Sequence, residues 1–135
     1  MDLTDERARA ILEEARTIAV VGASPNPARP SNQVASYLAD HGYEIIPVRP
    51  RVAEVLGVPC YPSLEDIPVQ VDVVVVFRRA EACPDVARSA VGIGAGVLWL
   101  QEGIVSAEAM QIAQDGGLEV VMDQCIRKVR DRLWP

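Results

Sequence analysis

The sequence predicts an α/β protein: a Rossmann-like, doubly wound and mostly parallel sheet of five or six strands with helices on both faces. Short apolar runs alternate with helix-like segments along all 135 residues. The runs are rich in Val, Ile and Leu, which suit strands buried on both faces. Strand–helix–strand units have right-handed crossovers and give parallel strands. We therefore expect a single domain over residues 1–135.

Composition and charge narrow the function classes. The net charge is -6, and only residues 127–132 form a basic run, which we interpret as a solvated last helix. We therefore expect no nucleic-acid partner. The longest apolar run, residues 69–77, is too short to span a bilayer, so we expect no membrane partner. Three scattered cysteines, a single histidine and a polar N-terminus predict reduced thiols, no metal site and a cytoplasmic location.

The first elements follow from periodicity and capping residues. Ala and Leu at helical spacing predict a helix over residues 5–15, and the apolar run TIAVV predicts a buried strand over residues 17–21. We expect Ser31 to cap a helix that runs to about Asp40, because its hydroxyl can accept from a free N–H group. This gives the strand–loop–helix start of a nucleotide-binding sheet.

The remaining elements repeat this alternation. YEIIPV predicts a strand over residues 43–48, and Pro47 places it at an edge because proline lacks an N–H group. A weak strand is expected over residues 57–61. Further strands are predicted at residues 71–77, 97–100 and 118–122, and helices at residues 80–91, 106–114 and 124–133. Ligands of such sheets bind at the carboxyl ends of the strands, so the residues there are the candidate site.

The loop at residues 22–31 follows the first strand and has the composition of a phosphate site. Gly22 permits close backbone approach, and the next helix offers free N–H groups and a positive dipole end. Ser24 and Ser31 add hydroxyl groups, and Arg29 adds a cation that suits phosphate oxygens. The alternative is a rigid connecting loop. Only the first glycine of the dinucleotide fingerprint is present, so the loop does not indicate NAD.

The end of the second strand also argues against NAD. An NAD site places Asp or Glu there to hold the ribose hydroxyls, whereas this strand ends in Val48, Arg49 and Pro50. A cation at this place favours a ribose phosphate, as in coenzyme A (CoA) or NADP. The alternative is that Arg49 is a solvated loop residue.

Polar residues follow the other strands as well, and together they outline one edge of the sheet. We expect a pyrophosphate or carboxylate contact from the two arginines after the strongest strand, and either adenine stacking or core packing from the Phe before them. The residues at these strand ends are Phe77, Arg78 and Arg79, then Gln101, Glu102 and Gly103, and finally Asp123, Gln124 and Cys125.

The sequence favours binding over catalysis without deciding the question. Cys125 begins a helix, where the dipole favours a thiolate, but Asp123 opposes that effect. His41 is expected at the opposite rim of the sheet, which leaves Cys125 without a base. Glu102 has the chemistry of a general base but no recognisable partner. We therefore assign no catalytic residue.

Several blocks in order resemble the small stand-alone CoA-binding proteins, whose domain is similar to the CoA-binding domain of the succinyl-CoA synthetase alpha subunit. The resemblance covers nearly the whole chain. The blocks are IAVVGASPNPARPSNQVASYL at residues 18–38, GYEIIPVRP at 42–50, YPSLEDIP at 61–68, VDVVVVFRR at 71–79, LWLQEGI at 98–104 and VVMDQC at 120–125.

The resemblance implies a Rossmann fold that carries CoA across the strand ends. It implies phosphate contacts from Gly22, Ala23, Ser24, Arg29, Pro30 and Ser31. It implies contacts with the adenosine part from Val48, Arg49 and Pro50, and a third contact segment at Phe77 and Arg78. It also implies a segment that faces the pantetheine arm, at Gln101, Glu102 and Gly103. Two positions depart from the family pattern. Arg49 replaces an Asn and Gln124 replaces an Arg, which puts the ribose contacts and the role of the last strand end in question.

Three hypotheses remain open from the sequence. The first is a CoA or acyl-CoA binding module without ligase activity, because the chain lacks a second domain and a suitably placed histidine. The second is an NADP-binding reductase, motivated by Arg49. The third is a non-catalytic interaction subunit that has lost ligand binding. The acyl group, protein partners and any homo-oligomer stay undetermined.

Overall fold

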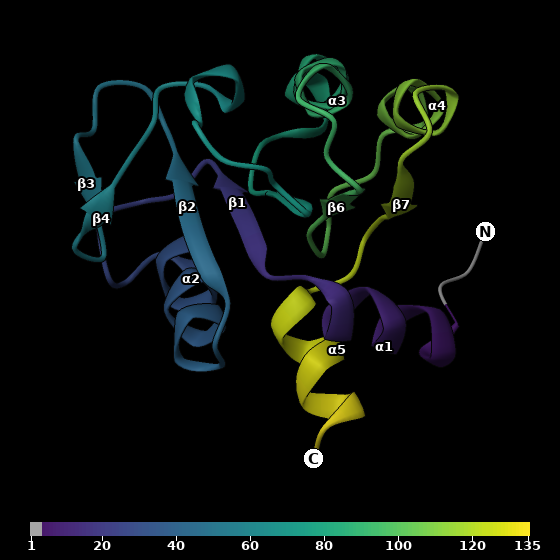
Figure 1. Ribbon diagram of the computed structural model, residues 1–135, viewed down its shortest axis with the longest axis horizontal. Coiled ribbons are helices and arrows are strands. Elements are labelled where there is room, and N and C mark those ends of the chain that lie inside the picture. The colour runs from purple at the N-terminus through teal and green to yellow at the C-terminus, as the bar shows by residue number, and fades with distance from the viewer. Residues whose placement is uncertain (1–3) are drawn as a thin grey trace.

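A five-stranded sheet forms the centre of the computed structural model, which describes residues 4–135 (Figure 1). The strand order is β2-β1-β5-β6-β7, and every neighbouring pair is parallel. The predicted Rossmann-like α/β fold is therefore confirmed, with five strands in the main sheet. The strands are β1 Thr17–Val21, β2 Glu44–Val48, β5 Val73–Val76, β6 Val97–Leu100 and β7 Glu119–Val121.

Helices cover both faces of the sheet, as the alternating pattern predicts. On one face, α1, α2 and α5 pack against side chains that include Ile18 and Trp99, both fully buried. On the other face, α3 and α4 pack through alanines against Val74 and Leu98. The helices are α1 Asp5–Glu14, α2 Pro30–Asp40, α3 Cys83–Gly92, α4 Ala107–Asp115 and α5 Ile126–Leu133. Within residues 4–135, no helix has the length and apolar character needed to cross a bilayer.

The weak strand expected at residues 57–61 is only partly correct. A small antiparallel hairpin stands there instead, formed by β3 Glu54–Val55 and β4 Val58–Pro59 outside the main sheet. Its two loop residues, Leu56 and Gly57, both have positive φ, as a tight hairpin turn requires. Tyr61 then makes an isolated parallel bridge to Val48. The predicted segment is therefore divided between a hairpin and the rim of β2.

Two helix starts differ from their predictions for local reasons. Ser31 does not cap α2. Pro30 occupies the first helical position with its fixed φ, so Arg29 is the N-cap. The helix expected from residue 80 begins as a 3₁₀ turn, Ala80–Ala82, and becomes α-helical at Cys83. The helix predicted at residues 106–114 forms as α4, and the structure adds that Ser106 is its N-cap, with a side chain that accepts from the Ala109 N–H.

The switch in crossover direction positions the candidate site. The chain leaves β1 through α2 on one face and leaves β5 through α3 on the other, so the two connections separate beside β1 (Figure 1). Ligands of open parallel sheets bind in the crevice that such a switch creates at the carboxyl ends. The first candidate residues to consider are therefore those that follow β2, β1 and β5.

Candidate functional site

Gly22 directs the chain away from the sheet at the end of β1. Its φ of +85° is disfavoured for residues with a side chain, and a Cβ atom there would overlap the carbonyl oxygen of Phe77. The Gly22 N–H donates to the Val48 carbonyl at 2.9 Å, and the Phe77 N–H donates to Val21 at 2.8 Å. The ends of β2, β1 and β5 therefore meet around a glycine that cannot be enlarged without displacing backbone.

Buried hydrogen bonds hold the loop after Gly22 in one shape. The Ser24 N–H donates to Ser31 Oγ at 3.0 Å, and Asn32 Nδ2 donates to the Ser24 carbonyl at 2.9 Å. The Asn26 N–H donates to Ser24 Oγ at 3.1 Å. Ser31 thus stabilises the loop rather than capping α2. Asn32 was missed by sequence reasoning, because an Asn in a first helical turn carries no signal of the distant carbonyl it binds.

A cavity of about 530 Å³ lies against this loop. Two exposed arginines reach it from different elements: Arg29 from the start of α2, and Arg49 from the end of β2. No carboxylate is among its lining residues. These are Gly22, Ser24, Pro25, Asn26, Arg29, Pro30, Ser31, Arg49 and Phe77. The cavity therefore offers positive charge and hydroxyl groups, which suits an anion.

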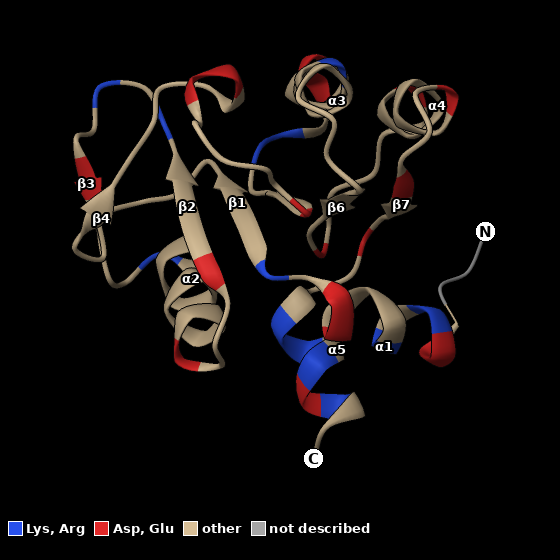
Figure 2. Cartoon of the chain, viewed as in Figure 1, with Lys and Arg blue, Asp and Glu red and all other residues tan. Residues whose placement is uncertain are grey.

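A second hollow, of about 460 Å³, shares Phe77 with the first. Arg78 and Arg79 line it together with Glu81 and Ala82. These two arginines stand on the segment that leads into α3, and a stretch of that segment is blue in Figure 2. Arg79 forms a long, exposed ion pair with Glu81 at 3.9 Å. We call residues 22–31, 49 and 77–79, which surround the two hollows, the open edge.

Three predicted residues near the open edge are placed differently from the rest. Ala23 and Val48 are buried in the two hydrophobic cores, and Pro50 is exposed without lining either hollow. Any role for Ala23 and Val48 in binding therefore passes through their backbone atoms or through shaping the cavity.

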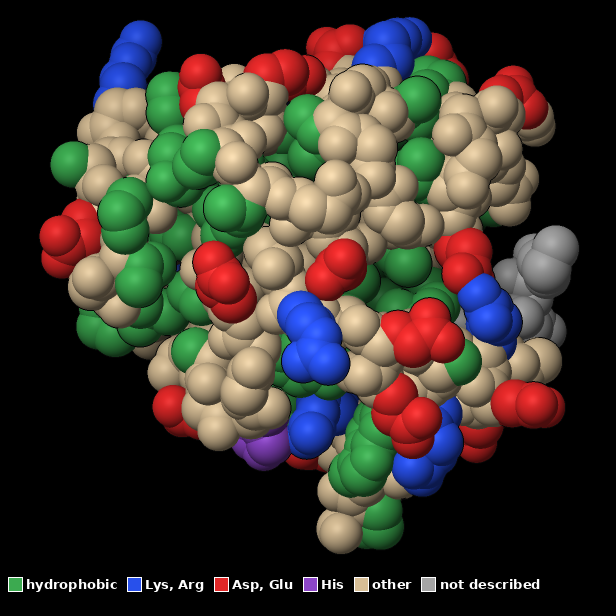
Figure 3. All heavy atoms as spheres, viewed as in Figure 1, with side chains coloured by type: hydrophobic (Ala, Val, Ile, Leu, Met, Phe, Trp, Pro, Cys, Tyr) green, Lys and Arg blue, Asp and Glu red, His purple; other side chains and the backbone are tan. Residues whose placement is uncertain are grey.

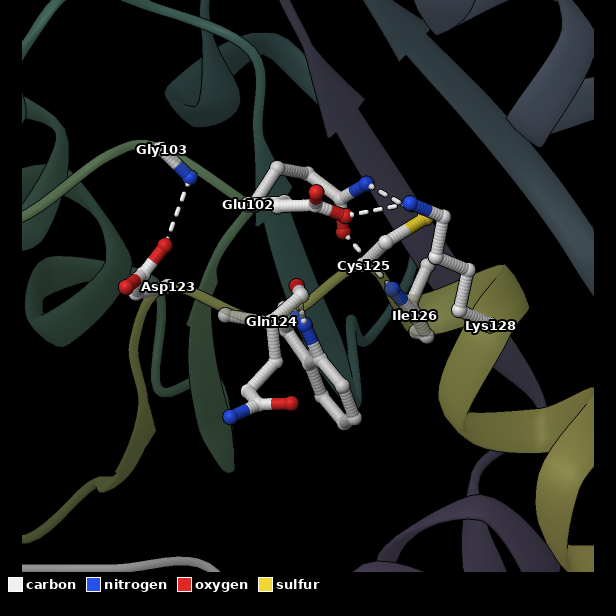
Figure 4. A network of polar contacts seen from close by, with 9 residues as sticks. Glu102, Gly103, Asp123, Gln124, Cys125, Ile126 and Lys128 are labelled. Atoms are coloured by element: carbon white, nitrogen blue, oxygen red, sulfur yellow. Dashed lines mark hydrogen bonds and ion pairs between the residues drawn. The ribbon is translucent and has the colours of Figure 1, made fainter.

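The predicted segment after β6 joins a hydrogen-bond network instead of a cavity (Figure 4). Gln101 is buried, and its Oε1 accepts from the Ile126 N–H at 3.0 Å, in the first turn of α5. Gln101 Nε2 lies 3.5 Å from Cys125 Sγ. The Trp99 indole donates to the Gln124 carbonyl at 2.8 Å. The residues that follow β6 and β7 therefore bind one another.

The exposed members of this network are paired as well. Lys128 Nζ donates to Glu102 Oε1 at 2.8 Å, and this hydrogen bond raises the pKa of Lys128 (Figure 4). The Gly103 N–H donates to Asp123 Oδ1 at 2.6 Å. We call residues 101–103 and 123–128 the bonded edge.

The cysteines and the histidine do not come together. Cys125 is the half-buried N-cap of α5, whereas His41 is the C-cap of α2. The single histidine, purple in Figure 3, lies below α2, away from the carboxyl end of β2. Cys83 is fully buried, and its burial raises the pKa of the thiol. None of these groups has the geometry of a nucleophile beside a base.

A family model described as a CoA binding domain matches residues 16–130. The chain belongs to this CoA-binding domain family. The match includes both the open edge and the bonded edge. The resemblance seen in the sequence blocks is therefore confirmed at the level of the family.

The chain is also similar to curated proteins and to solved structures. YneT of Bacillus subtilis is 45% identical over 117 residues, which are 87% of each chain. A structure described as a hypothetical protein from Pyrococcus horikoshii is 41% identical, with a TM-score of 0.96 over 98% of this chain and 94% of that one. The ADP-forming acetate–CoA ligase I of Archaeoglobus fulgidus is 28% identical over 87% of this chain, which spans 19% of that ligase.

Proposed function

We propose that this chain is a binding module for CoA or an acyl-CoA, held over the carboxyl ends of β2, β1 and β5. The observation that carries the proposal is the cavity of the open edge. It joins the start of α2 to Arg29 and Arg49 and contains no carboxylate. Membership of the CoA-binding domain family supports the choice of ligand. No nucleophile–base pair accompanies the cavity, so we propose binding without a reaction.

The phosphates of the ligand would lie at the start of α2. The positive end of the helix dipole attracts phosphate there, and Arg29 adds hydrogen bonds from a planar guanidinium. Arg78 and Arg79 flank the neighbouring hollow and would contact the same phosphates or the carboxylate of an acyl group. The ring of Phe77, which borders both hollows, would stack on adenine.

The pantetheine arm would pass toward the bonded edge. Gln101, Glu102 and Gly103 follow β6, the strand next to β5, so they stand beyond the phosphate site along the sheet. The Gln101 and Glu102 side chains and the Gly103 N–H already have protein partners. This arm would therefore add less affinity than the nucleotide half of the ligand.

Calorimetry tests the proposal directly. Protein shown to be folded and free of ligand is titrated with CoA, acetyl-CoA, NAD and NADP. We expect CoA species to bind and NAD to give no heat. If no CoA species produces heat or a thermal shift, the proposal is wrong, and an interaction subunit without ligand binding becomes the better explanation.

Arg29→Ala locates the ligand on the open edge. Charge-assisted hydrogen bonds to phosphate are strong, so we expect CoA affinity to fall about tenfold or more. Arg16→Ala is the matched control, because Arg16 is also an exposed arginine but lies at the opposite end of β1. Equal losses from both variants would indicate a general charge effect and would remove the open edge as the site.

An NADP-binding reductase remains the second candidate, because Arg49 suits the phosphorylated ribose of NADP as well as that of CoA. Competition between the two ligands for one preparation separates the candidates. We expect CoA to displace NADP. Stronger binding of NADP would favour the reductase.

A further inference from the structure

The last helix, α5, is basic in a chain that is acidic overall. The helix includes one carboxylate and four cations, whereas the net charge of the chain is -6. Figure 2 shows α5 in blue along most of its length. The buried side chains of α5 are all apolar and lie in the core, so the cations stand on the outer side of the helix. We call these four cations, Arg127, Lys128, Arg130 and Arg132, the basic face.

The helix dipole accounts for only part of the basic face. Cations are favoured in the last turn of a helix and disfavoured in the first turn, where the dipole is positive. Arg130 and Arg132 lie in the last turn of α5, but Arg127 and Lys128 lie in its first turn. Lys128 is compensated by Glu102, whose Oε1 lies 2.8 Å from Nζ. The position of Arg127 therefore needs another explanation.

Aromatic rings, rather than carboxylates, hold Arg127 and Arg130. The Arg127 guanidinium lies 5.0 Å from the centre of the Tyr37 ring, and that of Arg130 lies 5.0 Å from the centre of the Trp134 ring. Asp131, the one carboxylate of α5, accepts from the Tyr37 hydroxyl instead. Within residues 4–135, neither arginine forms an ion pair. Contact with a ring uses none of the N–H donors of a guanidinium, so most of these donors stay available.

This arrangement suits a partner that supplies carboxylates. A guanidinium binds a carboxylate through two parallel N–H donors, and arginine and aromatic side chains contribute strongly to protein interfaces. We propose that the basic face of α5 is a docking surface for a second protein whose own docking surface is acidic. Because Lys128 bonds Glu102, this partner would stand beside the bonded edge and would leave the open edge free for the ligand.

Three other occupants fit the basic face less well. A two-fold dimer would place the same cations opposite one another. Nucleic acid would be repelled by the rest of a chain whose net charge is -6. A lipid surface is bound by apolar side chains that enter the bilayer, and the buried apolar side chains of α5 lie in the protein core. The proposal therefore commits to an acidic protein surface.

The probe for this test is a fluorescent peptide rich in glutamate, and the same peptide with glutamine in place of glutamate is its control. Fluorescence anisotropy measures binding to the full chain at low ionic strength and at about 1 M salt. We expect only the glutamate peptide to bind, and we expect salt to abolish its binding because exposed ion pairs are screened. Backbone amide NMR shifts should change chiefly at residues 126–133.

Substitutions locate the bound peptide. Arg127→Ala should lower its affinity about threefold, and the double variant Arg127→Ala/Arg130→Ala about tenfold, as expected for exposed ion pairs. Arg88→Ala is the matched control, because it removes the same charge from α3 on the other face of the sheet. Arg29→Ala tests the open edge. Neither control should change the affinity. Thermal melts show that each variant is folded, and the exposed Arg127 alone carries the test if the double variant is unstable.

The other outcomes count against the proposal. No binding of the glutamate peptide, or an equal loss in Arg88→Ala, would overturn it. A loss confined to Arg29→Ala would assign the peptide to the open edge. Tighter binding of a DNA duplex or of phosphatidylglycerol vesicles through the same arginines would replace the acidic protein, as would a dimer that ultracentrifugation detects and Arg127→Ala abolishes. These measurements use no CoA, so failure here would leave the proposed function intact.

Discussion

The open edge and the bonded edge occupy the same kind of position in the sheet, but they differ in whether their polar side chains have protein partners. Both follow parallel strands, and both present charged and amide side chains. At the open edge, Arg29 and Arg49 border a cavity without ion-pair partners among the described residues. At the bonded edge, Gln101, Glu102 and Asp123 hold α5 and the loop after β6. A polar side chain that follows a strand is therefore available to a ligand only where no other residue of the protein binds it.

The largest effect is expected from Gly22→Ala, which should remove the open edge while leaving the bonded edge in place. The new Cβ would overlap the Phe77 carbonyl oxygen, and alanine disfavours the required φ of +85°. We expect stability to fall by at least about 2 kcal/mol and CoA binding to be lost. Chemical denaturation and calorimetry measure the two effects.

Gly42→Ala is the control for backbone strain alone. Gly42 also has a positive φ, +92°, but a Cβ atom there meets no neighbour within 4 Å. We expect a loss of about 1 kcal/mol and unchanged CoA affinity. If Gly22→Ala behaves like Gly42→Ala, the close approach to Phe77 is not a determinant of the site.

Gln101→Leu should destabilise the bonded edge and leave the open edge unchanged. The buried Ile126 N–H would lose its acceptor, which costs about 1–3 kcal/mol of stability. The affinity for adenosine 3′-phosphate 5′-diphosphate, the nucleotide half of CoA, should not change. A tenfold loss of that affinity would extend the nucleotide site onto the bonded edge and end the distinction between the two regions.

The smallest effect is expected from Glu102→Gln. The hydrogen bond from Lys128 raises the pKa of that lysine, so the folded state binds its proton more tightly than the unfolded state. The resulting stability is present below the ordinary lysine pKa of about 10.4 and is lost as the pH rises through the raised value. In Glu102→Gln the lysine should titrate at lower pH, which side-chain NMR can follow. An unchanged titration would mean that the pair does not persist in solution.

The sequence predicts the fold well because apolar runs and helical periodicity act locally. TIAVV and VLWL form strands at the predicted residues, since β-branched and aliphatic side chains buried on both faces leave few alternatives. The hairpin at residues 54–59 was missed because its strands have two residues each, too few for periodicity to register.

The predicted site depends on longer-range geometry. The predicted strands and the loop after the first one indicated where the candidate site should lie. Three of the residues predicted there, Arg29, Arg49 and Phe77, line one cavity. The sequence does not show that Gln101 accepts from an N–H group 25 positions away. Nor does it show that Ser31 binds the Ser24 N–H instead of capping α2. Such pairings arise only when the helices are packed.

The loop after β1 also limits how this protein can change. Ser24, Ser31 and Asn32 share buried hydrogen bonds, so their contributions to stability are coupled and should not add when they are substituted together. A replacement at one of the three restricts which residues the other two can accept. We therefore expect these three residues to be replaced together in evolution. The exposed arginines around the loop can be replaced one at a time, and each replacement should change the ligand preference.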